Sequence, residues 1–370
     1  MKHTFLLTLS MVFLAIALPL GVLISAQVRS ATLGGEAGGK GQDGQTGRKG
    51  EDGSDGQDLQ SQAGDYRISG PYTHKNLTIF LIHGKNLIES KNFLTLQEAL
   101  EQKKVVVYET QDVNELAIEN LSNEDVYVQS GDIVKGGQQD RLLSVDLIVP
   151  PKSGKMPIAA FCVERGRWSK RGSEQVANFS TSTDVAATKE IKLAAKQSNS
   201  QGGVWENVTV AQDKLSSNVG TRVNSTASES SLQLAVENRK VQETASGYTK
   251  ALADIVKGKD DVIGHAFAIN GQINSADVYA SNVLFNKLWP KLLKANAIEA
   301  IAELQKDGKF QPPTEADVRS FLAEAERGQV SEKEVTARVK LLTRESDQNI
   351  FFETRDGARK GVWIHRNYIK

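Results

Sequence analysis

The chain has 370 residues, of which 39% are hydrophobic and 24% are charged, and its 45 basic residues balance its 45 acidic residues. This composition is typical of a globular protein and excludes a chain that is disordered throughout. Because the formal net charge is zero, a general electrostatic attraction to nucleic acid is not expected.

The N-terminus has the pattern of an export signal. Lys2 and His3 precede an apolar run over residues 5–23, and Ala26 is a small residue suited to cleavage. Such a run is either a secretory signal or a membrane anchor. We favour cleavage, because Pro19 and Gly21 interrupt the end of the run. Residues 1–26 therefore predict an extracytoplasmic protein, secreted, periplasmic or anchored facing outward, that contacts the membrane only if this leader is retained.

A glycine repeat follows the leader. Residues 35–58 form eight consecutive triplets with glycine in every first position. This is the collagen pattern, since only glycine fits at the axis where three polyproline-II chains meet. The surrounding segment, 27–64, has no aromatic residue and cannot bury a core of its own. It is predicted to be a stalk or linker, either a short triple helix that makes a homotrimer or a flexible single-chain spacer, because the repeat contains no proline.

The first part of the globular body, 66–168, is predicted to be β-rich. Apolar, β-branched runs at 77–82 and 104–108 favour strands. Between them, Thr95 followed by Glu98 is the capping pattern of a short helix over 95–101. Short strands separated by turn clusters are typical of an antiparallel sandwich or barrel-like half. Further strands are expected at 115–120, 125–129, 141–149 and 156–163.

The second part, 169–370, is predicted to be α+β. Asn270-Gly271 is the favoured pair for a type I′ turn, which predicts a hairpin of 262–269 with 272–278. A long helix is expected over 282–305, kinked or begun at Pro290. Helices are also expected at 186–197, 229–238 and 314–327, and strands at 338–342, 349–354 and 361–368.

The densest polar segments are 131–141 and 161–168. Side chains alternate along a strand, so Cys162 and Glu164 are expected on one face. Together with Asp140 they are the catalytic candidates, an acid/base pair of Asp140 and Glu164 and a thiol. Paired glycines permit positive φ or close approach of a ligand, and the polar run that follows supplies donors, acceptors and a cation. The ligand-binding candidates are Gly136, Gly137, Gln138, Gln139, Arg141, Arg167 and Trp168.

Each of these residues also has a structural interpretation. Arg141 or Arg167 paired with Glu164 would hold strand ends together, and the two glycines would form a hairpin turn. Cys162 is the only cysteine, and a lone cysteine is more often buried than reactive. The five histidines are scattered singly, so neither a metal site nor a cofactor is expected. An open pocket lined by these side chains would favour binding or catalysis, whereas an ion pair that seals Glu164 would argue against catalysis.

An ordered series of motifs lies at 119–122, 131–132 with 135–141, 149–154, 161–164 with 166–168, 264–277 and 288–293. This series resembles a known family, the first type of the ARG and rhodanese-phosphatase-superfamily-associated protein domain (ARPP). The likeness covers about residues 66–370 and implies a single α+β unit. The family name refers to genomic association rather than to a reaction, and the leader and stalk lie outside it.

Two functions are compatible with the sequence. The first is a binding or envelope-associated module, displayed on the collagen-like stalk, that recognises an unknown ligand or envelope component. The second is a hydrolase that uses Asp140 and Glu164 as acid and base, with Arg141 and Arg167 holding a polar or anionic substrate.

Overall fold

The structure is a computed structural model that describes residues 63–88, 93–172, 174, 177–186 and 188–370. The leader and the collagen-like repeat lie outside the described residues, so the expectations for 1–62 stay predictions. The described residues all fall in one compact unit, 58–370.

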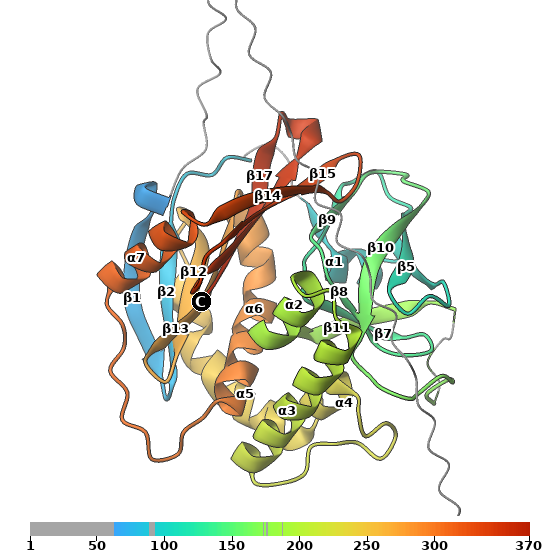
Figure 1. Ribbon diagram of the computed structural model, residues 1–370, viewed down its shortest axis with the longest axis horizontal. Helices are drawn as coiled ribbons and strands as arrows, with labels where there is room; N and C mark the ends of the chain where they lie inside the picture. Colours follow the sequence, from blue (N-terminus) through green and yellow to red (C-terminus); the bar gives the residue numbers. More distant parts are fainter. Residues whose placement is uncertain (1–62, 89–92, 173, 175–176, 187) are drawn as a thin grey trace, which may run out of the picture. The chain divides into compact units, whose positions relative to one another are not determined.

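An eight-stranded antiparallel sheet contains both ends of the globular body (Figure 1). Its first two strands come from the predicted β-rich part, yet β2 pairs along its length with β12 from the second part. One sheet thus spans both parts, as expected of a single α+β unit. Its order is β1 (Arg67–His74), β2 (Leu77–His83), β12 (Val262–Ile269), β13 (Gln272–Tyr279), β17 (Val362–Ile369), β16 (Ile350–Asp356), β15 (Val339–Glu345) and β14 (Gln329–Glu334).

A six-stranded sheet forms a nearly closed barrel. A bridge between Tyr108 and Asn178 brings its first and last strands together. The α+β class with a barrel-like β-rich part is therefore confirmed. The order is β11 (Phe179–Ala186), β7 (Asp132–Gly136), β8 (Arg141–Leu143), β10 (Lys155–Cys162), β5 (Glu115–Asn120) and β4 (Val105–Glu109). A three-stranded sheet joins β3 (Leu94–Thr95), β6 (Val126–Val128) and β9 (Leu147–Val149).

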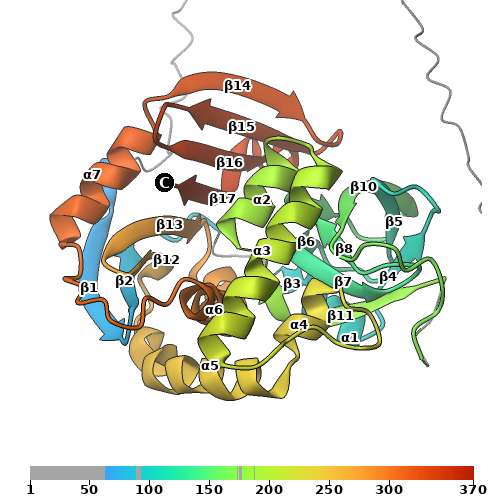
Figure 2. The same cartoon turned by 60° about the horizontal axis from the view of Figure 1, so that its bottom comes forward.

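Helix α6 (Asn282–Ala302) lies at the centre of the body. Figure 2 shows it between the β12–β13 hairpin and helices α3 (Gln201–Val219) and α5 (Arg239–Leu252), and it packs against all of them. Its buried residues lie on every side, which is the pattern of a core helix. The remaining helices are α1 (Leu96–Glu101), α2 (Lys189–Lys196), α4 (Leu232–Val236) and α7 (Glu315–Ala325), with short 3-10 turns at Ala63–Asp65, Ala253–Val256 and Gly357–Arg359. No helix in the described ranges is both long and apolar enough to cross a membrane.

Several predicted elements begin, turn or end at the residues that the local sequence pattern indicated. Thr95 caps α1 with a complete capping box, and Asn270 and Gly271 have positive φ in the turn of the β12–β13 hairpin. Pro290 lies inside α6 rather than at its start.

The structure corrects three sets of secondary-structure predictions. No strand was predicted at the positions of β1, β7, β11 and β14. Residues 141–149 form two strands, β8 and β9, because Asp146 between them turns inward and accepts hydrogen bonds from Ser130 and Tyr127. Helices α3 and α5 were missed, since glycine, serine and threonine give their sequences weak helix propensity. Tertiary packing stabilises α3 instead, along an apolar stripe that includes Val204, Val208, Ala211 and Leu215.

Candidate functional site

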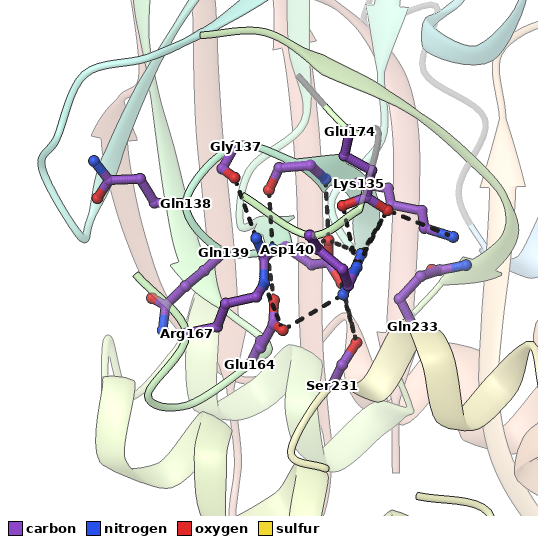
Figure 3. Close-up of polar contacts among 12 residues, drawn as sticks. Lys135, Gly137, Gln138, Gln139, Asp140, Glu164, Arg167, Glu174, Ser231 and Gln233 are labelled. Carbon is purple, nitrogen blue, oxygen red and sulfur yellow. Dashed lines mark hydrogen bonds and ion pairs between the residues drawn. The ribbon is translucent and has the colours of Figure 1, made fainter. Parts of the chain in front are cut away.

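The double-glycine loop meets the segment that follows the cysteine-bearing strand, and Figure 3 shows Asp140 of the loop beside Glu164. Strands β8 and β10 are neighbours, and Arg141 lies opposite Cys162 in their register. Gly136 ends β7, so the polar residues between β7 and β8 are held beside the end of β10. The structure thus brings together the two segments that the sequence singled out.

The two candidate carboxylates are sealed inside a network of hydrogen bonds. Asp140 and Glu164 both have 0% exposed surface. Glu164 Oε1 accepts from Arg167 Nε at 2.7 Å, and its Oε2 accepts from the backbone N–H of Asp140 at 3.1 Å. Asp140 Oδ1 accepts from the Gly136 N–H at 3.0 Å. Both acids are therefore saturated with protein donors.

Arg171 completes this network, and the sequence reasoning missed it. Its guanidinium donates to both oxygens of Asp140, at 2.9 and 3.0 Å, and lies 3.4 Å from Glu164. Ser231 also donates to Asp140, at 3.0 Å, while capping α4. The run of arginines after the cysteine strand was the available signal for Arg171, whereas Ser231 is 91 positions from Asp140 and had none.

The network moves the pKa values of the two carboxyls in opposite directions. Burial raises the pKa of Asp140, assisted by the nearby charge of Glu164 and opposed by Arg171. Burial also acts to raise the pKa of Glu164, but hydrogen bonds, first from Arg167, outweigh it and lower that pKa. Opposite shifts are what an acid/base pair requires. The ion pairs, however, leave no exposed surface through which either group would meet a substrate.

A second set of polar residues fills the barrel interior. Arg141 and Gln139 have 0% exposed surface, and Arg141 Nη1 donates to Cys162 Sγ at 2.7 Å and to Gln139 Oε1 at 3.2 Å. Its Nη2 lies 3.5 Å from Glu109. Burial raises the pKa of the Cys162 thiol to about 11, so the thiol is protonated at neutral pH and is a poor nucleophile. Cys162 is the last residue of β10, so the expected sharing of a strand face does not extend to Glu164.

The predicted ligand-binding residues divide into sealed and accessible ones. Gly137 has positive φ, and a Cβ at this position would lie 2.3 Å from the ring of Phe179. The ring of Phe179 thus occupies the space beside Gly137 that a ligand would need. The carbonyls of Gly136 and Gly137 accept hydrogen bonds from Arg167. Gln138 is half-buried, and Trp168 is 52% exposed.

A second buried centre joins the large sheet to the barrel, and the sequence did not reveal it. His365 on β17 contacts Asp146 at 3.2 Å through Nδ1 and Asp277 on β13 at 3.0 Å through Nε2. Burial acts to lower the pKa of His365, but the two carboxylates outweigh it and raise that pKa. The side chain of Lys196, 3% exposed, lies 3.6 Å from Asp146. His265 and His365, which are a hundred positions apart in the sequence, both lie close to Asp277 in the fold.

These two centres belong to a chain whose family is identified by comparison. A family model described as "ARG and Rhodanese-Phosphatase-superfamily-associated Protein domain", ARPP-1, matches residues 65–369. The chain belongs to the ARPP-1 family. No curated protein and no solved structure matches it. The family assignment confirms the resemblance, and both centres lie within the matched residues.

The ARPP-1 domain also places a serine, a histidine and an aspartate in contact at one sheet edge. His83 Nε2 lies 2.7 Å from Ser69 Oγ, and Nδ1 lies 2.9 Å from Asp261. Arg67 also approaches Nδ1, at 2.7 Å. Asp261 can only accept and Arg67 can only donate, so these two contacts to Nδ1 favour opposite tautomers of His83. Arg67 also donates to Asp261 at 2.7 Å, so the carboxylate that would orient the histidine of a hydrolytic triad is shared with a surface arginine.

Proposed function

We propose that this ARPP-1 protein acts by binding rather than by catalysis. The observation that carries the proposal is the complete burial of Asp140 and Glu164 by Arg167 and Arg171. A general acid or base must come within hydrogen-bond reach of the proton that it transfers. Two carboxylates with no exposed surface and full sets of protein donors do not meet that requirement, which argues against the hydrolase alternative.

The same proposal includes export and display. The apolar leader supports an extracytoplasmic location, and the glycine repeat at 35–58 supports a stalk that projects the ARPP-1 body and associates as a homotrimer. The partner is then a ligand or an envelope component. Nucleic acid is not an expected partner, because the chain has no net charge.

Light scattering during size exclusion tests the display part of the proposal. The mature chain is expected to have the mass of a trimer, and a chain that lacks residues 35–58 is expected to be a monomer. A monomer in both cases would exclude trimerisation by the repeat. Fractionation of cells that express the full chain, with and without residues 1–26, tests export, and equal cytoplasmic retention of both would contradict it.

Assays for turnover test the binding part. Incubation with ester, phosphate-ester and glycoside substrates is expected to give no product above that of a variant in which Asp140→Asn and Glu164→Gln are combined. A product that depends on these two carboxylates would overturn the proposal in favour of the hydrolase.

A further inference from the structure

A polar hollow lies where the turn of the β12–β13 hairpin meets the first turn of α2 and the segment after α6. Its volume is about 510 Å³, within the range of roughly 300–1,000 Å³ that small-molecule sites occupy. The side-chain amides of Gln272, Asn274 and Gln305 line it, together with the ring of Phe310. The hollow is separate from both buried centres described above.

Hydrogen bonds between its walls hold the hollow open. Asn270 Nδ2 donates to the Glu303 carbonyl at 2.6 Å, which ties the hairpin turn to the end of α6. Asn76 donates both to Asn270, at 3.1 Å, and to the Ala300 carbonyl, at 2.8 Å. At Gly271 the turn approaches the next segment so closely that a Cβ would lie 2.7 Å from the Gln311 carbonyl. A guest thus meets a preformed site and need not order its walls.

Asn274 is a fixed part of the wall of the hollow. Its side chain is held by a hydrogen bond from Nδ2 to Glu299 Oε1 at 2.8 Å, and the residue is only 6% exposed. Its side-chain oxygen, Oδ1, is itself buried, so it offers no acceptor to a guest. The polar groups that a guest meets are therefore the exposed side chains of Gln272 and Gln305.

The charges around the hollow favour a neutral guest. Its lining includes two lysines, Lys189 and Lys309, and two glutamates, Glu190 and Glu303, so the formal charges cancel. Lys189 also donates to the Lys370 carbonyl, and Glu303 is paired with Lys214 at 2.6 Å. A strongly anionic or cationic guest would meet a like charge on one side.

We propose that this hollow binds a neutral saccharide. Hydroxyl groups both donate and accept, which matches the side-chain amides of Gln272 and Gln305. The ring of Phe310 offers a flat apolar surface to the C–H face of a pyranose. The inference rests on the proposed function, because it assigns a ligand class to a body that acts by binding.

Saturation-transfer NMR and calorimetry on the mature chain test this assignment. The probes are glucose and N-acetylglucosamine, with the disaccharide and tetrasaccharide of each, and glycerol serves as the non-cyclic control. We expect saturable transfer to the ring protons of at least one series and none to glycerol. If the monosaccharide, disaccharide and tetrasaccharide of a series bind with equal affinity, the ligand is a free sugar. If affinity rises with the number of sugar units, the ligand is the end of a polymer.

Two variants with matched controls locate the site. Gln272→Ala and Phe310→Ala are each expected to weaken binding at least tenfold. Gln329→Ala and Leu121→Ala replace exposed residues outside the hollow and are expected to bind as the wild type does. Urea unfolding of all four checks that each variant is folded, and Gln272, exposed at the hairpin turn, keeps the test valid if Phe310→Ala is unstable.

Three outcomes would overturn the saccharide assignment. These are no saturable binding by any probe, binding that survives both hollow variants, or binding that either control variant abolishes. If the chain is exported and displayed but binds no saccharide, the saccharide assignment is rejected and the proposed display is not. Conversion of a probe into product in the same NMR samples would instead reject the proposed binding function. If Gln272→Ala then abolished that conversion, the hollow would still be the site.

Discussion

Arg171 illustrates how a single buried cation decides the behaviour of its neighbours. The residue is 9% exposed and contacts the carboxylates of Asp140, Glu164 and Glu174. Burying ions is costly, and the pairing offsets that cost only while every partner remains. The same contacts that bury and pair Asp140 and Glu164 thus make the loop dependent on Arg171.

Replacement of Arg171 by methionine is expected to destabilise the fold by about 3 to 5 kcal/mol, because it leaves buried carboxylates uncompensated. Urea unfolding measures the effect. Arg239→Met is the matched control, since Arg239 is 91% exposed and forms only a surface pair with Glu243. Adding Asp140→Asn to Arg171→Met should restore part of the loss. A variant as stable as the control would show that the network contributes little.

Glu299 is the residue for which pH should matter most clearly. Burial raises its pKa from 4.5 to about 7. The folded state therefore binds a proton more tightly than the unfolded state, so this group costs stability as the pH rises from about 4.5 to about 7.

Glu299→Gln removes that titration. The variant is expected to match the wild type below about pH 4.5 and to be more stable by about 3 kcal/mol at pH 8. Urea unfolding across this range provides the measurement. Parallel pH profiles for the two proteins would contradict the raised pKa.

At the scale of single elements, helices differ in how much their N-terminal caps contribute to stability. Thr314 forms a complete capping box with Asp317 at the start of α7, whereas Thr188 at the start of α2 makes no side-chain cap hydrogen bond. Both residues are threonines in the same position, so the chain contains its own control.

Thr314→Ala is expected to destabilise the protein by about 1 kcal/mol, because it removes an acceptor for the first-turn N–H groups. Thr188→Ala should change stability by much less. Thermal or urea unfolding of the two variants side by side makes the comparison. Equal losses would mean that the capping box at α7 adds nothing beyond the side chain itself.

At the scale of the whole molecule, the proposal separates display from folding. Two buried centres and α6 hold the ARPP-1 body together within the residues that the structure describes, 63–370 with short gaps, and the repeat lies outside them. A defect in the repeat should therefore change association and leave the stability of the body unaltered.

Gly47→Ala tests this separation, because a Cβ at the axis of a triple helix disrupts it. The variant is expected to lose the trimer in light scattering while the body unfolds at the same urea concentration. Gln45→Ala, at a non-glycine position of a neighbouring triplet, should leave the trimer intact. A trimer that survives Gly47→Ala would assign association to another part of the chain.

Local features were predictable from the sequence because their physical causes lie within a few residues. The capping boxes at Thr95 and Thr314 and the positive φ of Asn270 and Gly271 depend on neighbours in the chain. The motifs of the ARPP-1 family could also be recognised, because each of them is a short stretch of sequence. The polar segments of the candidate site were found, and β8 pairs with β10 where they meet.

Only the tertiary structure decided whether those polar residues were open or sealed. Asp140 owes its state to Arg171 and to Ser231, which is 91 positions away, and His365 meets Asp146 across 219 positions. Helix α3, with weak local propensity, exists because its apolar stripe is buried. Burial and charge pairing depend on which distant segments come into contact. Residue types and spacing therefore identified the polar groups of this protein, while folding determined which of them solvent or a ligand can reach.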